Sequence, residues 1–406
     1  MHNVIFTAPI LNVNAIPTIR SVAGVTDTQV SVISQDPETS LPPDVRGMLM
    51  DFLQVENALS DEQLYVAATR IQEKTGKIDR MFAANEQVQV QVAIVREKLS
   101  IEGMTAETMR NFRDKSKMKA VLAKHDVPCA ANQLAESTQQ AWEFVHRTGY
   151  PVVAKPPAGA GAEFTYKIDD DAALHSILAK HPPGLANQLL LEEYITGEEF
   201  SFDTFSVNGK MVWHSLTKYL PPPLEVKRNS WIQWRVVLPR EVDTSEYDGI
   251  RKAGTKALKV LGAQTGISHM EWFRRPDGRV AISEVGMRPP GAQITTLMSR
   301  AHEFDCMGAW ATLMIKGTFS PPQRKYACGC AYLRGQGHGV VRQVSGFDQI
   351  QGELGAMITE YRLPEIGQGS SGSYEGEGFV IVRHPETKVV EDALLHIVST
   401  MHVQMG

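Results

Sequence analysis

Two short apolar strands joined by a tight turn constrain this chain more than any other feature. They occupy residues 266–291, GISHMEWFRRPDGRVAISEVGMRPPG, around a Pro-Asp-Gly turn. Because alternate side chains of an extended strand share a face, each strand delivers one carboxylate, Glu271 or Glu284, to a predicted hairpin. The pattern therefore predicts a sheet element that presents paired acidic side chains.

Other residues of the hairpin suggest what those carboxylates bind. His269 shares the face of Glu271, and Arg288 shares the face of Glu284. Two carboxylates beside an arginine suit Mg²⁺ holding a triphosphate, because Mg²⁺ takes carboxylate oxygens and substrate phosphates. This indicates phosphoryl chemistry. A surface hairpin with two solvated glutamates is the alternative that the segment alone leaves open.

A glycine loop precedes the hairpin, in GYPVVAKPPAGAGAEFTYKI (residues 149–168). We interpret it as a strand ending in Lys155, a loop with Gly159 and Gly161, and a second strand. Glycines let backbone N–H groups turn toward a phosphate, and the lysine adds a flexible positive charge. The spacing excludes a Walker A loop, which needs Gly-Lys-Ser/Thr after its second glycine. A plain hairpin loop remains the alternative.

The next segment, NQLLLEEYITGEEFSFDTF (residues 187–205), has two strands separated by a Thr-Gly break. Backbone groups of Glu192, Glu193 and Ile195 are predicted to hold an adenine ring in an apolar slot. Glu199 is predicted to accept the ribose hydroxyls. Acidic residues beside a turn are otherwise solvated surface, which we expect for Glu198.

The order of these motifs resembles the ATP-grasp superfamily of carboxylate–amine ligases. The resemblance spans roughly residues 1 to 400, and its motifs are NFRDKSKMKAVLAKHDVPCA, VVAKPPAGAGA, LLLEEYITGEEFSFDTF, HMEWF and ISEVGMRPPG. It implies the α/β ATP-grasp fold, with ATP and Mg²⁺, or Mn²⁺ in its place, as cofactors. The EVGMRPPG form is more similar to the amino-acid and dipeptide ligase branch than to the carboxylase branch. The implied reaction joins small-molecule carboxylate and amine substrates through an acyl phosphate, giving ADP and phosphate.

The resemblance also implies roles for individual residues. The metal ligands match Glu271 and Glu284, and Arg288 and Lys155 match the catalytic cations near the transferred phosphate. Many members carry asparagine where this chain has Gly286, which leaves one or two metal ions open. The expected nucleotide-binding set is Lys115, Lys155, Gly159, Ala160, Gly161, Glu192, Glu193, Ile195 and Glu199. The expected substrate-facing set is His214, Lys218, His269, Arg288 and Gly291.

Two other functions stay open at this point. The first is a different enzyme, either a carboxylase that uses carboxyphosphate or a kinase-like grasp protein. The second is a regulatory or scaffold protein that binds a nucleotide without turnover. The chain has the expected charged residues Lys155, Glu271, Glu284 and Arg288, which argues against a protein without turnover. Gly286, in place of the asparagine of many members, leaves that alternative open.

Composition narrows the class of protein. With 406 residues, 43% of them hydrophobic and 21% charged, the chain is long enough for several domains with their own cores. The net charge of −5 argues against nucleic acid as the main partner. NVIFTAP is too short for a signal peptide, and no apolar run approaches the length of a membrane span. We therefore expect a cytoplasmic protein without a membrane partner, and a homodimer remains open.

The predicted organisation is an N-terminal parallel-sheet pre-ATP-grasp domain (1–105), a lid (106–190), a large subdomain with the metal site (191–325) and a small C-terminal α+β region (326–406). Residues 3–36 show the strand-helix-strand pattern of a parallel sheet. VQVQVAIV is predicted to be helical, with a strand as the alternative.

Two further segments carry expectations of their own. The proline-rich segment 219–239 is predicted to be a stiff loop that recognises a carboxylate or a flat substrate. Its alternative is an edge strand with aromatic side chains on the core. The cysteines lack Cys-x-x-Cys spacing and are expected as free thiols, with Cys328-Gly-Cys330 in a strand.

Overall fold

The computed structural model describes residues 1–157 and 164–406. Its first part, here called the N-terminal sheet with its helices, contains β1 (His2–Thr7), α1 (Ala15–Ala23), β2 (Thr28–Ser34), α2 (Pro43–Arg46), β3 (Asp51–Gln54), α3 (Asp61–Thr75), β4 (Arg80–Phe82), α4 (Gln89–Lys98) and α5 (Ala106–Arg113). The strands are parallel in the order β3-β2-β1-β4, as the sequence pattern predicts. Alternating side chains of β1 reach both faces: Phe6 packs toward α1, and Ile5 toward α3. VQVQVAIV lies within α4, so the helical prediction is confirmed.

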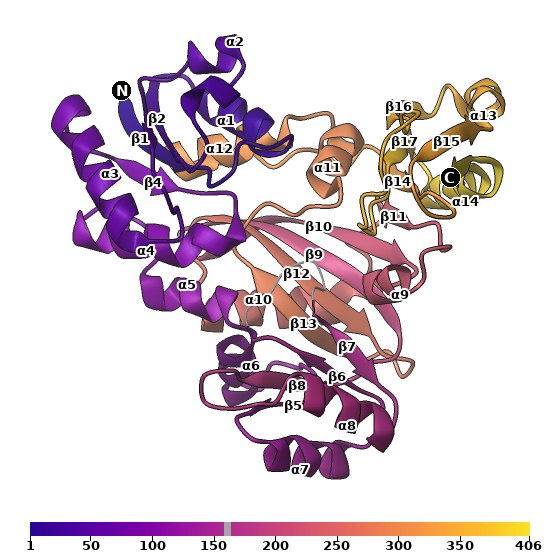
Figure 1. Cartoon of the computed structure of the whole chain (residues 1–406). Helices are drawn as coiled ribbons and strands as arrows, with labels where there is room; N and C mark the ends of the chain where they lie inside the picture. Colours follow the sequence, from indigo (N-terminus) through magenta and orange to yellow (C-terminus); the bar gives the residue numbers. More distant parts are fainter. Residues whose placement is uncertain (158–163) are drawn as a thin grey trace.

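The lid follows and is built on an antiparallel sheet with the strand order β5-β8-β6-β7. Its hydrophobic core joins Phe144 of α7 and Leu174 of α8 to buried strand residues such as Val152 and Leu191. The lid elements are α6 (Lys115–Lys124), β5 (Asn132–Ala135), α7 (Thr138–Thr148), β6 (Val152–Lys155), β7 (Tyr166–Ile168), α8 (Asp171–Lys180) and β8 (Leu189–Glu193). Figure 1 shows the lid at the end of the molecule opposite the N-terminal sheet.

A large antiparallel sheet connects the rest of the chain. Its part of the sequence contains β9 (Glu198–Val207), β10 (Lys210–Leu220), α9 (Pro223–Arg228), β11 (Arg235–Leu238), α10 (Asp248–Leu261), β12 (Gly266–Arg274), β13 (Val280–Gly286), α11 (Ile294–His302), α12 (Cys306–Lys316), β14 (Ala327–Leu333), β15 (Val341–Ser345), α13 (Phe347–Leu354), β16 (Ile358–Arg362), β17 (Gly378–His384), α14 (Thr387–Thr400) and β18 (His402–Met405). The strand order is β13-β12-β9-β10-β11-β14-β17-β16, and β15 pairs separately with β18. Strands from the C-terminal quarter therefore continue the sheet that carries the predicted hairpin (Figure 1).

The large sheet has one apolar and one polar face near β12. Phe202, Met270 and Trp272 are buried in a cluster with residues of α10 such as Ala257. Ser201 pairs with Glu271 across the opposite face, and Asp203 pairs in the same way with His269. Directly opposed residues of antiparallel strands share a face. We call this polar side the cavity face.

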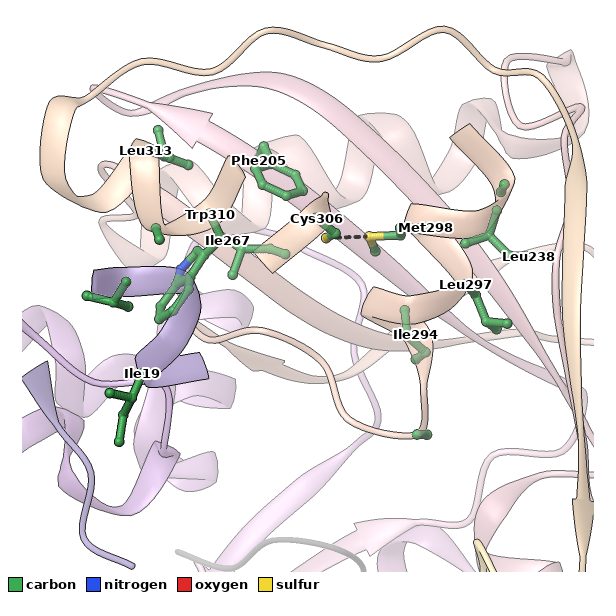
Figure 2. Packing of buried hydrophobic residues seen from close by; sticks show 14 of the residues in the cluster. Ile19, Phe205, Leu238, Ile267, Ile294, Leu297, Met298, Cys306, Trp310 and Leu313 are labelled. Atoms are coloured by element: carbon green, nitrogen blue, oxygen red, sulfur yellow. Dashed lines mark hydrogen bonds between the residues drawn. The ribbon is translucent and has the colours of Figure 1, made fainter. Parts of the chain in front are cut away.

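A second apolar cluster joins the N-terminal sheet to the large sheet. The indole of Trp310 on α12 meets Phe6 and Phe82 edge-on, with ring centroids 6.5 and 5.5 Å apart. Figure 2 shows Ile19 of α1 beside the same indole, and the sulfur atoms of Cys306 and Met298 lie 3.7 Å apart. This packing holds the N-terminal sheet against α12.

The proline-rich segment 219–239 is neither the expected loop nor the expected edge strand, although Pro222, Pro223 and Trp234 line the cavity described below. It contains helix α9 and then β11, which pairs with β10 on one side and β14 on the other, so it is no edge strand. Pro222 and Pro223 precede and begin the helix, where the missing N–H of proline costs no hydrogen bond. Trp234 is buried, whereas Trp231 is 67% exposed.

Cys328 and Cys330 lie in β14, and all four cysteines are free, as expected. Within the described ranges, no helix combines the length and apolar character needed to cross a membrane.

Candidate active site

A cavity of about 1380 Å³ lies where the N-terminal sheet, the lid and the cavity face meet. Of the residues singled out from the sequence, those that line this cavity are Lys115, Lys155, Glu192, Glu193, Ile195, Glu199, His269, Glu271, Glu284, Arg288 and Gly291. The predicted loop residues Gly159, Ala160 and Gly161 lie outside the described residues. Residues from all five motifs therefore share one cavity.

Glu271 and Glu284 are directly opposed on β12 and β13. The register shifts immediately after Glu271, so a bulge lies beside the pair. The Lys115 ammonium donates to Glu284 Oε1 at 2.6 Å. Within residues 1–157 and 164–406, no cluster of three or more metal-ligating His, Cys, Asp or Glu side chains is assembled. Any metal at this position would have the two glutamates as its protein ligands.

A chain of polar contacts runs from Ser201 through Asp203 and His269 to Glu271. Ser201 donates to Asp203 Oδ2 at 2.6 Å, and His269 Nδ1 lies 2.6 Å from Asp203 Oδ1. The other ring nitrogen, Nε2, lies 3.7 Å from Glu271 Oε1. Burial would lower the pKa of His269, but the Asp203 carboxylate outweighs burial and raises it to about 9. The contact with Asp203 therefore favours the protonated form of the imidazole.

Two lysines share one buried carboxylate at the lid side of the cavity. Lys155 Nζ lies 2.9 Å from Glu192 Oε2, and Lys119 Nζ lies 3.3 Å from Glu192 Oε1. Burial would lower the pKa of Lys155, but Glu192 and then Glu284 outweigh it, so that pKa is raised. The Lys155 ammonium is thus held in its charged form beside the cavity.

Arg288 is anchored by a residue of the N-terminal part. Its Nε donates to Glu86 Oε2 at 2.8 Å, and Glu86 also meets Arg113 at 3.2 Å. Burial would raise the pKa of Glu86, but Arg288 more than reverses this and lowers it. Gly286 lies beside the pair: a Cβ there would be 3.5 Å from Arg288 Cγ and 3.9 Å from Glu86 Oε2. Position 286 therefore lies within van der Waals distance of both members of the Arg288–Glu86 pair.

The link between β8 and β9 shapes the predicted adenine slot. Arg275 binds Glu193 through two hydrogen bonds, of 2.6 and 3.0 Å. Gly197 has φ +140°, and a Cβ there would lie 2.1 Å from the Arg274 carbonyl oxygen, so only glycine fits. Burial, and then the charge of Glu271, raise the pKa of Glu199 well above its usual value. The neutral, protonated form of Glu199 is therefore favoured as long as no positive charge lies beside it in the cavity.

The expectation that His214 and Lys218 point into the site is wrong. Neither lines the cavity: His214 lies 3.5 Å from Asp243, and Lys218 lies 3.3 Å from Glu198. The reason is strand register, because His214 pairs with Thr204, one position away from Asp203 and thus on the opposite face. Tyr219 follows Lys218 in the strand, so its side chain lies on the opposite face, and it lines the cavity.

Glu86, Lys119 and Asp203 are residues that the sequence reasoning missed. Lys119 follows Lys115 by four positions, a helical spacing that places both on one side of α6. Asp203 alternates with Ser201 and Glu199 in a strand, so the period of two could have found it. Glu86 follows β4 at the carboxyl edge of a parallel sheet, where binding residues gather in α/β folds.

Comparisons with known proteins agree with this geometry. Residues 113–218 match the sequence profile of the phosphoribosylglycinamide synthetase ATP-grasp (A) domain. The L-arginine-specific L-amino acid ligase of Bacillus subtilis is 25% identical over 233 residues, which cover 56% of this chain and 55% of that protein. The match thus spans little more than half the length of this curated relative.

Solved structures resemble the chain over its whole length. The crystal structure of an L-amino acid ligase from Bacillus licheniformis has a TM-score of 0.78 at 17% identity, covering 100% of this chain and 99% of that one. N5-carboxyaminoimidazole synthetase from Staphylococcus aureus, complexed with ADP, has a TM-score of 0.68 at 12% identity, covering 97% and 96%. The fold is thus the ATP-grasp fold, and the resemblance seen in the sequence motifs is confirmed.

Proposed function

We propose that this chain, which has the ATP-grasp fold, is an ATP-dependent ligase that joins a small carboxylic acid to an amine. The observation that carries the proposal is the meeting of Glu271, Glu284, Lys115, Lys155 and Arg288 at one cavity. Paired carboxylates and three cations are what a magnesium triphosphate needs, and they come from separate parts of the chain. The B. subtilis and B. licheniformis relatives, both L-amino acid ligases by name, support an amino acid as one substrate.

The donor set fits Mg²⁺. Mg²⁺ is usually held by one or two carboxylates together with substrate phosphates and water, and Glu271 and Glu284 are opposed on neighbouring strands. When bound there, the ion would neutralise the triphosphate and hold its γ-phosphoryl group in place. Lys115 would then transfer its contact from Glu284 toward the phosphates, since its ammonium already lies at the metal site. Mn²⁺, with similar oxygen ligands, could take the same place.

ATP would lie with its adenine at the β8–β9 link and its phosphates over β12 and β13. Ile195 is apolar and lines the cavity there, and backbone groups of this link would hold the ring. A Glu199 carboxyl oxygen would accept a hydrogen bond from a ribose hydroxyl. The S. aureus neighbour, complexed with ADP, supports a nucleotide in this fold.

The first chemical step transfers the γ-phosphoryl group. A carboxylate oxygen of the acid attacks the γ-phosphorus, the bond to the β,γ-bridging oxygen breaks, and ADP leaves with that electron pair. Arg288 and Lys155 would neutralise the charge that develops on the phosphoryl oxygens, because phosphoryl transfer depends mainly on positioning and electrostatics. Glu86 keeps the Arg288 guanidinium in place through their 2.8 Å contact.

In the second step the amine nitrogen attacks the acyl carbon, and phosphate leaves with the electrons of the broken carbon–oxygen bond. The attacking amine must be unprotonated. Asp203 favours the protonated form of His269, so we assign no base to the amine. Water must be kept from the acyl phosphate, and the residues of the N-terminal sheet and of the lid that line the cavity would limit its access.

Phosphate release from ATP and Mg²⁺ in the presence of pooled amino acids tests the proposal. We expect release that requires at least two components, an acid and an amine, and a new amide product by mass spectrometry. A matched reaction with bicarbonate tests the carboxylase alternative, which the N5-carboxyaminoimidazole synthetase neighbour favours. Release that depends on bicarbonate and not on amino acids would replace the ligase proposal. ATP binding without release under any condition would support a regulatory protein.

A further inference from the structure

We infer that Lys119 is a positioning residue that leaves Lys155 with an unbalanced positive charge for the nucleotide phosphates. The inference rests on the proposed ATP site. Lys119 itself does not line the cavity, whereas Glu192 and Lys155 do, so it acts on the site through its charge on these two neighbours.

The geometry of α6 brings Lys119 to this position. The Asp114 side chain accepts the Ser116 and Lys117 N–H groups and so fixes where the helix begins. Lys115 and Lys119 are four residues apart and therefore lie on one side of the helix. Lys115 reaches Glu284 at 2.6 Å, and Lys119 reaches Glu192 at 3.3 Å. A single helix thus supplies one cation to the metal hairpin and one to the adenine side.

Lys119 is completely buried, with 0% of its surface exposed. Among the described residues, its Nζ has no hydrogen-bond partner of good geometry, and Glu192 Oε1 also lacks one. The ion pair at 3.3 Å is therefore held by charge rather than by a well-formed hydrogen bond. A buried ammonium that served only packing would be costly, because an apolar side chain of the same length would fill the space without desolvating a charge. Retaining a charge here calls for an electrostatic role.

Charge balance gives that role. Glu192 stands between Lys119 and Lys155. Burial lowers the pKa of Lys119, and the Glu192 carboxylate opposes this. With both lysines protonated, the set of three carries one net positive charge. Without Lys119, the carboxylate and Lys155 would cancel each other. Glu284 and Glu271 also act on Lys155 and bring further negative charge to its surroundings. The second lysine therefore restores the attraction that Lys155 needs toward phosphate.

The experiment measures nucleotide binding by calorimetry, without turnover. Lys119→Met nearly conserves side-chain volume and removes the charge. We expect its affinity for ATP to fall about tenfold or more, and its affinity for adenosine to stay unchanged, since adenosine carries no phosphate. In the double variant Lys119→Met with Glu192→Gln, the buried negative charge is also gone, so ATP affinity should return close to that of the unaltered protein. Lys117→Met, on the exposed side of the same helix, is the matched control and should bind ATP normally.

The results distinguish an electrostatic role of Lys119 from a purely structural one. Unchanged ATP affinity in Lys119→Met would overturn the inference, as would a parallel loss of adenosine affinity, which indicates structural damage. A double variant weaker than the single variant would mean that Lys119 and Glu192 act as a structural clamp. If Lys119→Met does not fold, the double variant is compared directly with the unaltered protein, and the inference requires equal ATP affinity. Failure of the unaltered protein to bind ATP would instead refute the proposed function.

Discussion

Lys115 on α6 donates to Glu284 on β13 at 2.6 Å, across 169 residues of sequence. The contact joins α6, the first element of the lid, to the β12–β13 hairpin, which carries both proposed metal ligands. It also places a cation proposed for phosphate binding in direct contact with a carboxylate proposed for metal binding. Occupation of the proposed metal site and of the proposed phosphate site would therefore be coupled, because the charge of Glu284 acts directly on Lys115.

Glu284→Ala is expected to abolish turnover while the protein stays folded. The residue is proposed to hold Mg²⁺, and its side chain is 22% exposed, so its removal leaves no closed cavity in the core. Loss of a metal-binding carboxylate should lower the rate about a thousandfold or more, which corresponds to about 4 kcal/mol of transition-state stabilisation.

Phosphate release and thermal unfolding, measured on the same sample, check this expectation. Glu143→Ala, an exposed glutamate on α7, serves as the matched control and should release phosphate normally. A folded Glu284→Ala protein with near-normal phosphate release would remove Glu284 from the metal site.

Glu86→Gln is expected to lower kcat about tenfold or more while ATP affinity changes little. The amide keeps the shape of the side chain but loses the charge that holds Arg288 at 2.8 Å and meets Arg113 at 3.2 Å. A misplaced guanidinium would stabilise the transferring phosphoryl group less well.

Steady-state kinetics with varied ATP separate the two parameters. Glu102→Gln removes an exposed carboxylate that pairs with Arg80 in the same part of the chain, and it should behave like the unaltered protein. Equal kcat values for Glu86→Gln and Glu102→Gln would show that Arg288 needs no anchor.

Acid should destabilise the fold through His302 and His214. Burial, and then the charge of Arg324, lower the pKa of each ring from 6.5 to about 4. A folded-state pKa below that of the unfolded chain means that the stabilisation by the neutral rings is complete above pH 6.5. It is lost as the pH falls from 6.5 toward 4, at about 1 kcal/mol per pH unit for each ring.

Urea unfolding at several pH values between 7 and 4 measures this slope. In His302→Gln one buried ring is absent, so the fall in the free energy of unfolding with acid should be shallower. His175→Gln alters an exposed ring and should leave the slope as it is. An identical slope in all three proteins would exclude the His302 ring as a cause.

The β12–β13 hairpin could be predicted because the residues that determine it lie close together in the sequence. Alternation along β12 and β13 places Glu271 and Glu284 on one face, and a Pro-Asp-Gly turn sets them opposite each other. Helices such as α4 could be predicted for a similar reason, since length and a terminal glycine decided between helix and strand.

The orientation of β10 could not be predicted. The register shifts between Met211 and Trp213, so one extra residue reverses which side chains of the remaining strand face the cavity. His214 and Lys218 were placed on the wrong face because no local pattern reveals such a bulge. The contact of Glu86 with Arg288 was missed for another reason: it spans 202 residues and depends on packing between the N-terminal sheet and the hairpin.

The ligase proposal makes its sharpest prediction about the path of one oxygen atom. If the acid is first phosphorylated, its carboxylate oxygen becomes the bridge to phosphorus. The amine then attacks the carbon, and that oxygen leaves with the phosphate. An acid labelled with ¹⁸O in its carboxylate should therefore transfer one labelled oxygen to the released phosphate, with ADP as the other product.

Mass spectrometry of the phosphate measures the transfer, and the reaction should require both Mg²⁺ and the true acid. A parallel reaction with Glu284→Ala is the control and should give no labelled phosphate above background, because Glu284 lies at the proposed metal site. An adenylating enzyme would place the label in AMP and release pyrophosphate. Detection of those products would refute the acyl phosphate and would move Arg288, which lines the cavity beside Glu284, from the γ-phosphate to the α-phosphate.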